Sequence, residues 1–463
     1  MELQFYGAAA RVTGTCHILR TREYTVLLDC GLIQGSAEEE ALNREPFPFD
    51  PSAIDAVVLS HGHIDHSGRL PLLMKRGFRG PVYTQHATVD LLSVLLLDSA
   101  SLAERDADFR RRHPANRRDR SVQPLYTRED ALKAIGLLRG MEYLAEKEIL
   151  PGVLLRFLDA GHILGSAVVE LTLRERDQER VVVFSGDLGQ YGGPVLRDPE
   201  TPFRADVVLV ESTYGDRLHR EFKDTVDELG DIFRTACREC GNILIPAFSI
   251  GRSQELLYLF ATYYDQWELE QWQVYLDSPM AIDAGRIYWD YPALLDEEAL
   301  ELRNNPSLLP PLRNLHFTDR VEASRKINDI RQGAIIIAGS GMCNGGRILH
   351  HLKHNIWRRE CRVIITGYQA EGTLGRQLVS GDREVSIHGR SYRVEAGIHT
   401  VGGLSAHGDR SDLLRWLQGF SNKPDVYVVH GDSDAKISFR NIVEEQLHHN
   451  AVIPAAGDRV KLL

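Results

Sequence analysis

The chain has 463 residues, of which 43% are hydrophobic and 26% are charged, and its net charge at pH 7 is -11. This composition is that of a folded globular protein and excludes a disordered or fibrous chain. No stretch approaches the ~20 apolar residues of a membrane helix, no secretory signal is apparent, and six scattered cysteines form no disulfide framework, so we expect a cytoplasmic protein.

The first 205 or so residues contain short apolar runs separated by turn residues, a pattern that predicts strands. Examples of such runs are 3–6, 24–28, 56–59, 153–158, 167–173 and 181–184. Longer patterns of helical period predict helices at 89–102 and 129–144, and a helix start at 67–74.

From about residue 211 strands and helices alternate, which is typical of a parallel sheet. The expected pairs are 242–246 with 252–264, 273–276 with 281–289, and 334–338 with 346–353. After about residue 378 the chain returns to a strand, a histidine motif and a helix at 411–417.

Three imidazoles and a carboxylate occur within six residues, directly after the apolar run 56–59. They are His61, His63, Asp65 and His66. Imidazole and carboxylate ligands suit zinc, and the absence of a nearby cysteine argues against a closed structural zinc site. A loop of solvated histidines is the alternative, but so many histidines in six residues are hard to obtain by chance. We therefore predict a metal site at the end of a strand.

Four further polar residues lie at or just after other apolar runs. They are His162, Asp187, His407 and His430. Taken singly, Asp187 is most simply a turn residue and His407 the start of helix 411–417. Taken as an ordered set, the four indicate later members of the same site.

These motifs together resemble a known family. The positions that match the four motifs of the metallo-β-lactamase fold are, in chain order, Asp29, His61 to His66 (HxHxDH), His162 and Asp187. The positions that match motifs A, B and C of its β-CASP branch are Glu211, His407 and His430. That branch contains nucleic-acid-processing hydrolases, and the resemblance spans Gly7 to His430.

The resemblance implies an α/β fold, in which an inserted β-CASP domain with a helix-flanked parallel sheet interrupts a metallo-β-lactamase αββα sandwich. The expected boundaries are 1–208 and 378–463 for the sandwich and 209–377 for the insert. An insert also explains how His407 and His430 rejoin the site of the first region.

The resemblance further implies two zinc ions, with manganese as the alternative metal. One zinc would take His61, His63 and His162, the second Asp65, His66 and His430, with Asp187 bridging both. The residues expected to act in catalysis are His407, Glu211, Asp65, Asp187 and Asp29. Of these, His407 is the candidate general acid, because imidazole titrates near working pH, while Glu211 and Asp29 orient histidines.

In this family an imidazole at motif C accompanies RNA-processing members, so His430 points to single-stranded RNA as the substrate. Three glycine-rich segments of the insert precede an arginine or a helix, where backbone N–H groups suit a phosphate; tight turns are the alternative. The residues expected to bind substrate are Ser249, Arg252, Ser340, Gly341, Met342, Thr373 and Arg376.

Three other clusters have two interpretations each. Seven arginines within residues 105–120, against three aspartates, are either a solvated helix with a loop or a basic patch. The lone CxxC of residues 237–240 favours an ordinary helix end over a zinc or redox site. A polar helix face is favoured over a third metal site for His350, His351 and His354.

We therefore expect a two-zinc ribonuclease, an endonuclease, a 5′→3′ exonuclease or both, in RNA processing or decay. The alternatives are a metallo-hydrolase of a small-molecule ester, thioester or lactam, and an inactive subunit of an RNA-processing complex. The sequence does not fix the native RNA, the 5′-end requirement or whether the protein forms a homo-oligomer.

Overall fold

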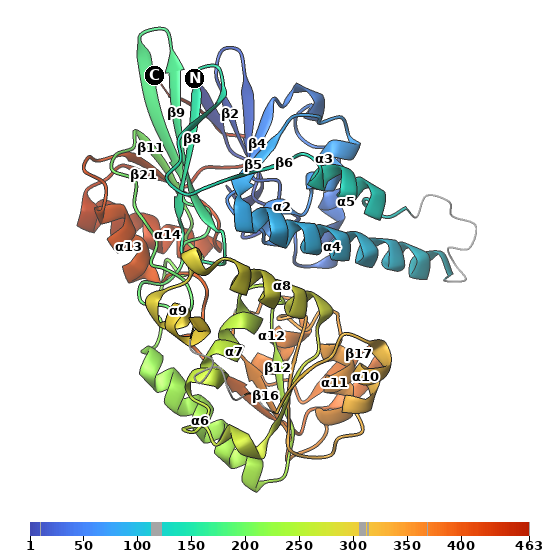
Figure 1. Ribbon diagram of the computed structural model, residues 1–463. Coiled ribbons are helices and arrows are strands. Elements are labelled where there is room, and N and C mark those ends of the chain that lie inside the picture. The colour runs from blue at the N-terminus through green and yellow to red at the C-terminus, as the bar shows by residue number, and fades with distance from the viewer. Residues whose placement is uncertain (10, 113–122, 305–311, 313, 368, 463) are drawn as a thin grey trace. The chain divides into compact units, whose positions relative to one another are not determined.

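The computed structural model describes residues 1–9, 11–112, 123–304, 312, 314–367 and 369–462 (Figure 1). The chain forms two compact units. The first unit comprises Met1–Gly193, Arg197–Leu218 and His407–Leu463, and the second comprises Pro194–Leu196 and His219–Ala406.

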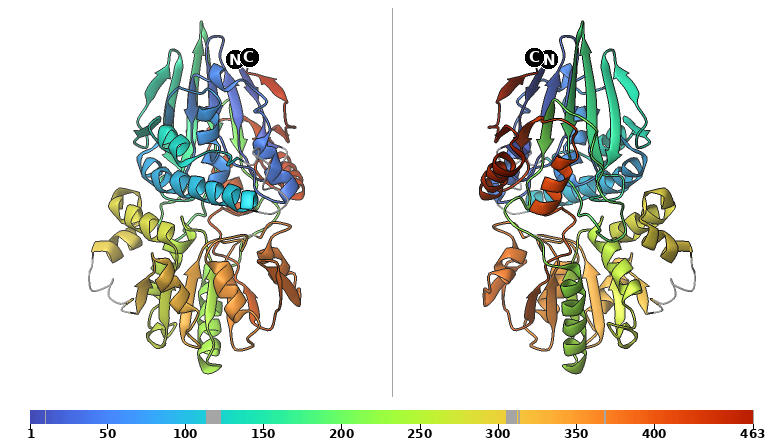
Figure 2. Two further views of the ribbon diagram at one scale, coloured as in Figure 1. Left: turned by 90° about the vertical axis from the view of Figure 1, so that its right-hand side faces the viewer. Right: turned by 90° about the vertical axis from the view of Figure 1, so that its left-hand side faces the viewer.

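Two seven-stranded sheets form the centre of the first unit. In spatial order, the first sheet contains β22 (Arg459–Lys461), β1 (Glu2–Gln4), β2 (His17–Arg20), β3 (Thr25–Leu28), β4 (Ala56–Val58), β5 (Val82–Gln85) and β6 (Leu138–Met141). The second contains β21 (Ala451–Val452), β20 (Asp425–Val428), β11 (Val207–Val210), β10 (Gln178–Phe184), β9 (Ala167–Glu175), β8 (Val153–Asp159) and β7 (Lys147–Leu150). Because β1 and β22 are antiparallel neighbours, the two ends of the chain lie side by side (Figure 2).

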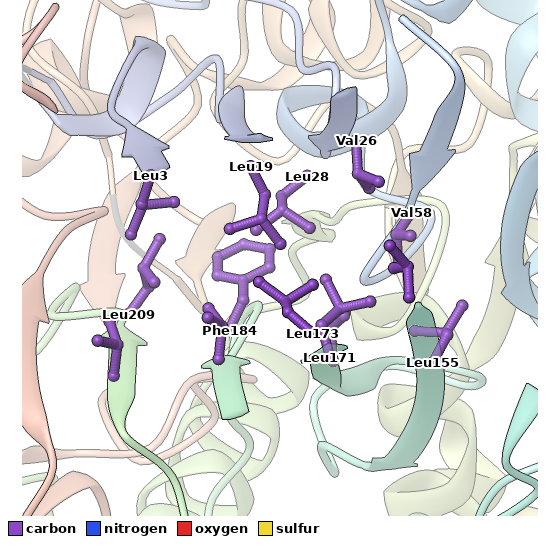
Figure 3. Packing of buried hydrophobic residues seen from close by; sticks show 14 of the residues in the cluster. Leu3, Leu19, Val26, Leu28, Val58, Leu155, Leu171, Leu173, Phe184 and Leu209 are labelled. Atoms are coloured by element: carbon purple, nitrogen blue, oxygen red, sulfur yellow. The ribbon is translucent and has the colours of Figure 1, made fainter. Parts of the chain in front are cut away.

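Apolar side chains from the two sheets pack face to face. Figure 3 shows Leu19 and Leu28 of the first sheet opposite Leu171 and Phe184 of the second. All four are at most 2% exposed, and burying a side chain of this size stabilises the fold by about 1.5–3 kcal/mol. The sheets are therefore the two inner layers.

Helices cover the outer faces of both sheets. Those of the first unit are α1 (Ala37–Ala41), α2 (Ile64–Ser67), α3 (Leu70–Lys75), α4 (His86–Arg112), α5 (Arg128–Ile135), α13 (Arg410–Gln418) and α14 (Ser433–Ile442). Leu73 of α3 and Leu96 of α4 pack with Val57 of the first sheet. Trp416 of α13 packs with Val208 of the second sheet. The predicted αββα sandwich is confirmed.

The second unit has a six-stranded sheet in which every neighbouring pair is parallel, as predicted. Its strands, in spatial order, are β14 (Leu315–Phe317), β13 (Gln273–Leu276), β15 (Ala334–Ala338), β12 (Ile243–Pro246), β16 (Arg362–Ile365) and β19 (Gly397–Thr400), and a separate hairpin contains β17 (Glu384–Ile387) and β18 (Arg390–Arg393). Its helices are α6 (Phe222–Arg238), α7 (Arg252–Thr262), α8 (Pro279–Asp290), α9 (Glu297–Asn304), α10 (Val321–Ile327), α11 (Ile348–Asn355) and α12 (Leu374–Val379).

Two expectations differ from the structure in their bounds. The insert was expected to end at residue 377, but the second unit continues to Ala406 because β19 pairs with β16 in its sheet. A helix was expected over 129–144, but α5 ends at Ile135 and residues 138–141 form β6. Pairing of β6 with β5 overrides the helical pattern there.

Helix α4 differs from the expectation that no stretch of the chain is long and apolar enough for a membrane helix. Residues 86–108 are long and apolar enough, by length and composition alone, to cross a membrane. Leu92, Leu96 and Ala100 of this helix are buried in the core beneath the first sheet, so we interpret α4 as a core helix. The arginine-rich stretch 105–120 continues from α4 into residues 113–122, which lie outside the described residues.

Candidate metal centre

The histidine loop follows β4 and is fixed to the chain that follows β3. The N–H groups of Cys30 and Leu32 donate to the carbonyls of His66 and Ile64 at 2.7 and 2.9 Å. Between them, Gly31 lies so close to the loop that an added Cβ would stand 1.5 Å from the carbonyl oxygen of Asp65. These hydrogen bonds hold the histidine loop in place. Only glycine fits at residue 31, because its backbone packs directly against the loop.

The first group of candidate ligands comprises His61, His63, His162 and Asp187, whose donor atoms lie within 4.8 Å of one another. The Nε2 atoms of His61 and His162 each lie 3.1 Å from Nδ1 of His63. They lie 3.4 and 3.5 Å, respectively, from Oδ2 of Asp187. Four ligands placed ~2.0–2.1 Å from one zinc stand about 3.3 Å apart at the corners of a tetrahedron, so this spacing fits a zinc ion.

The second group comprises Asp65, His66 and His430. The Nε2 atoms of His66 and His430 lie 3.2 Å apart, and they lie 3.9 and 3.5 Å from Oδ2 of Asp65. His430 reaches this position from the end of β20, where its backbone has a φ of 48° and its N–H donates to the carbonyl of Ala8 at 2.9 Å. This group has the donor types and the spacing of a second cation site.

Asp187 turns one carboxylate oxygen toward each group. Oδ2 faces His61 and His162, whereas Oδ1 lies 3.2 Å from Nε2 of His66 and 3.7 Å from Nε2 of His430. Oδ1 is buried and has no hydrogen-bond partner in the described part of the chain. A buried carboxylate oxygen is costly unless a cation compensates it, so the residues present fit two metal ions that share this carboxylate.

Asp29 and Ser60 orient two of the histidines. Oδ2 of Asp29 lies 2.7 Å from Nδ1 of His66, and Oγ of Ser60 lies 3.0 Å from Nδ1 of His61. The Ser60 hydroxyl itself donates to Oδ2 of Asp29 at 2.7 Å. With Nδ1 engaged in this way, each ring presents Nε2 to its group, which is the arrangement of a metal-binding imidazole.

At His66, burial is outweighed by the Asp187 and Asp65 carboxylates, which raise the pKa well above its usual value. At His61 and His63 burial prevails and favours the neutral ring: it lowers the pKa of His61 to about 3 and that of His63 to about 4. A neutral imidazole has the lone pair that a metal requires, so the burial of these rings favours ligation.

A histidine–carboxylate pair stands beside the two groups. Nδ1 of His407 lies 3.0 and 3.2 Å from the two carboxylate oxygens of Glu211, and the rings of His407 and His162 are 4.5 Å apart. Glu211 is fully buried, and its Oε1 also accepts from the N–H of Leu188 at 2.7 Å. Burial opposes a charge on His407, but the Glu211 carboxylate outweighs it and raises the pKa of His407 to about 9.

Sequence reasoning missed two polar neighbours of the ligands. One is Ser60, and the other is Thr213, whose Oγ1 lies 3.1 Å from Nδ1 of His430. Both adjoin a recognised motif, but hydroxyl residues are common in loops, and only the fold shows that these two contact a ring.

The seven residues expected to bind substrate all lie in the second unit. Five of them lie in the loops after β12, β15 and β16, at the carboxyl ends of parallel strands, and Arg252 and Arg376 lie in the first turns of α7 and α12, which follow two of these loops. Two of these loops are hydrogen-bonded, because the N–H of Gly375 donates to the carbonyl of Met342 at 3.1 Å. Within the loop after β15, Oγ of Ser340 accepts from the N–H of Asn344 at 3.0 Å. The structure therefore brings these segments together.

Some of the seven side chains have internal partners. Arg252 is 7% exposed and forms an ion pair with Glu255 of its own helix. Thr373 is 2% exposed and accepts from the N–H of Arg376 at the start of α12. Oγ of Ser249 lies 3.1 Å from Oγ of Ser278. Substrate contact stays a prediction for all seven.

The CxxC motif and the histidines of α11 lie outside the metal-ligand groups of the described residues. Cys237 and Cys240 are free thiols at the end of α6. His351 is fully buried, with Nε2 at 2.7 Å from Asp277 and Nδ1 at 2.9 Å from Asn328. Among the described residues, no metal-ligand group includes His350, His351 or His354.

Three family models match the chain. The metallo-β-lactamase superfamily matches residues 10–219, the Beta-Casp domain residues 253–378, and the Zn-dependent metallo-hydrolase RNA specificity domain residues 391–454. Ribonuclease TTHA0252 of Thermus thermophilus is 39% identical over 96% of both chains. The chain belongs to the β-CASP family of the metallo-β-lactamase superfamily.

More distant relatives of this β-CASP protein are also found. An RNase J-like protein of Methanocaldococcus jannaschii is 28% identical over 98% of both chains. The transcription termination factor FttA of the same organism is 29% identical over all of this chain and 72% of its own length. A crystal structure of a protein of unknown function from Enterococcus faecalis has the same fold over 99% of both chains, with a TM-score of 0.54 and 14% identity.

Proposed function

We propose that this β-CASP protein is a metal-dependent ribonuclease that hydrolyses phosphodiester bonds of single-stranded RNA. The observation that carries the proposal is the hydrogen-bonded pair of His407 and Glu211 beside two ligand groups joined by Asp187. Hydrolysis of a phosphodiester needs an activated water, compensation of the phosphate charge and a proton for the leaving oxygen.

The proposed ligands of one zinc ion are His61, His63 and His162, and those of the other are Asp65, His66 and His430, with Asp187 between them. Zinc ions bound there would supply a water of lowered pKa and compensate charge on the phosphate. The predominance of imidazole among the donors favours zinc over manganese in this proposal.

The protein's own residues hold and move the remaining proton. Glu211 holds the Nδ1 side of His407, so that Nε2 is the nitrogen that donates to the leaving oxygen. The His407 side chain is 21% exposed, which allows contact with substrate, whereas Glu211 is fully buried and acts through His407.

The relatives support RNA as the substrate. One of them is named a ribonuclease, another is RNase J-like, and one of the matching family models describes an RNA specificity domain. A complete set of ligand residues argues against an inactive subunit, because a site that has decayed lacks one or more of its metal ligands.

The test is digestion of 5′-labelled single-stranded RNA by zinc-loaded protein, with and without a chelator. We expect cleavage that the chelator stops and added zinc restores, and no cleavage by His63→Ala or Asp187→Ala. A thioester, an ester and a lactam are assayed in parallel. Hydrolysis of one of these without cleavage of RNA would sink the proposal in favour of a small-molecule hydrolase.

The same RNA, prepared with a 5′ phosphate or a 5′ triphosphate, separates the two modes of cleavage. Release of a labelled mononucleotide from the 5′ end identifies a 5′→3′ exonuclease, and longer labelled products identify an endonuclease. Reconstitution with manganese in place of zinc shows which metal supports the faster turnover.

A further inference from the structure

Trp357 is an exposed tryptophan of the second unit, and the residues around it take no part in the proposed reaction. Trp357 follows α11 and opens the segment Trp357-Arg358-Arg359-Glu360 that leads to β16. It is 50% exposed, whereas Trp267, Trp272 and Trp416 are at most 1% exposed. An indole exposed to water lacks much of the hydrophobic stabilisation that burial provides. A ligand that covers this ring would therefore gain binding free energy.

Hydrogen bonds of Arg358 and of the preceding Ile356 hold this segment in place. The side chain of Arg358 is 8% exposed, and its guanidinium donates to Oδ1 of Asn355 at 3.0 Å and to the carbonyl of Arg331 at 2.6 Å. The carbonyl of Ile356 accepts from the N–H of Glu395 at 2.9 Å, which joins this segment to the chain before β19. The backbone that carries Trp357 is therefore held in place, and its exposed ring offers a platform for stacking.

Two exposed guanidinium groups share one carboxylate beside this platform. Nε of Arg359 lies 3.0 Å from Oε2 of Glu395, and Nε of Arg393 lies 2.6 Å from Oε1. The two arginine side chains are 83% and 78% exposed. Their terminal nitrogens have no acceptor in the described part of the chain, so two positive charges against one negative charge leave paired N–H donors for a phosphate.

These groups line one open depression of about 460 Å³. Its lining residues are Trp357, Arg358, Arg359, Glu360, Arg393 and Glu395. It lies before β16 and β19, and hence at the amino ends of the parallel strands. The loops expected to bind substrate lie at the carboxyl ends of the same sheet, so the depression is a separate place.

An aromatic platform next to arginines is the combination that binds single-stranded nucleic acid, because bases stack on the ring and cations hold the backbone. We propose that this depression is a second RNA-binding site, where Trp357 stacks on a base and Arg359 and Arg393 bind the adjacent phosphate. This proposal rests on the proposed function for its ligand, and it predicts that long RNAs gain a contact that short RNAs lack.

Binding is measured by fluorescence anisotropy in an Asp187→Ala background, which prevents cleavage, with a single-stranded RNA of about 30 nucleotides. Trp357→Ala should weaken binding about tenfold, as loss of one base–aromatic stack does. Trp357→Phe should retain most of the affinity, because the phenyl ring still stacks. Arg359→Ala and Arg393→Ala should each lower the slope of log affinity against log salt by up to ~0.7.

Matched controls come from the same unit. Phe317→Ala removes an aromatic side chain that is 59% exposed, and Arg286→Ala removes an arginine that is 74% exposed and paired with Asp283. Neither control should change affinity or salt dependence.

Cleavage is then measured in protein that retains Asp187 and the other predicted metal ligands. For Trp357→Ala, KM for the long RNA should rise about tenfold with kcat unchanged, while cleavage of an RNA of about five nucleotides stays at the wild-type rate. Binding and KM equal to those of Phe317→Ala overturn the second site. So does a changed oligomeric state of Trp357→Ala with unchanged RNA binding, which would make the depression a protein interface. If the wild type binds long RNA through Trp357 but cleaves neither RNA, the proposed function fails and the second site stands.

Discussion

Oδ2 of Asp29 lies 2.7 Å from Nδ1 of His66, and neither side chain is more than 1% exposed. Oδ1 of the same carboxylate accepts from the N–H of Ser60 at 2.7 Å, so the carboxylate cannot turn away. The ring of His66 is therefore locked, with Nε2 presented to His430 and Asp187. Asp29 thus orients a predicted ligand without being placed as a ligand itself.

Replacing this carboxylate should loosen the metal without removing a ligand. We expect Asp29→Asn to weaken zinc binding about 10–100-fold, the usual effect of losing a carboxylate behind a metal-binding histidine. Competition with a chromophoric chelator measures the affinity. Asp50→Asn is the matched control, because Asp50 caps an exposed turn of the same unit. Equal zinc affinity in the two variants would contradict the orienting role.

Substitutions of His407 and Glu211, unlike that of Asp29, should lower turnover and leave the metal content unchanged. His407→Ala should reduce kcat about 10²–10⁴-fold, the usual worth of a general acid, with a normal metal content. Glu211→Gln should lower kcat by a smaller factor, since the ring remains but loses its charged partner. Metal analysis of the purified variants provides the check. Loss of metal from Glu211→Gln would make Glu211 a ligand, because it also lies close to Asp187 and His430.

The structure brings the residues that the sequence predicted as ligands into two groups, because each of them lies at the end of a strand or in the loop that follows it. The structure brings Asp65 and His430, which are 365 positions apart, to 3.5 Å. What the sequence did not supply is which atom faces which partner. The division of Asp187 between two groups, and the contacts of Ser60 and Thr213 with ring nitrogens, depend on backbone paths that no local pattern encodes.

The fold was predicted best where the chain repeats one type of element. Long strands such as β8, β9 and β10 and the alternation of the second unit were recognised. Several short strands, such as β2 and β5, were not expected. The helix expected over 129–144 was half wrong, because residues 138–141 become a strand only by pairing with β5. Pairing between distant segments carries no local signal.

A substitution at Gly31 tests the close contact between this residue and the backbone of the histidine loop. An added Cβ would overlap the backbone of Asp65, so Gly31→Ala should lower the free energy of unfolding by about 3 kcal/mol or more and reduce metal content. Gly285→Ala is the opposite case, because nothing lies within 4 Å of a Cβ there and the residue is inside α8. It should stabilise the protein by up to ~1 kcal/mol. Urea unfolding compares the two, and equal stabilities would contradict the close approach at Gly31.

Asp159 predicts how stability depends on pH. Its carboxyl lies at the end of β8, where Oδ1 accepts from the N–H of Gly161 at 2.9 Å. Burial, together with the nearby Glu200 carboxylate, raises the pKa of Asp159 to about 7. An aspartate in an unfolded chain has a pKa of about 3.9, so between these values the folded state holds a proton that the unfolded state has released.

The stability that Asp159 contributes is therefore complete below pH ~4 and is lost as the pH rises toward 7, by at most ~1.4 kcal/mol for each unit. Asp159→Asn keeps an oxygen for the N–H of Gly161 but cannot ionise. Its free energy of unfolding should exceed that of the wild type by more at pH 8 than at pH 5. Urea unfolding at both values measures this difference. A difference that is the same at the two pH values would show that Asp159 has an ordinary pKa in the folded protein.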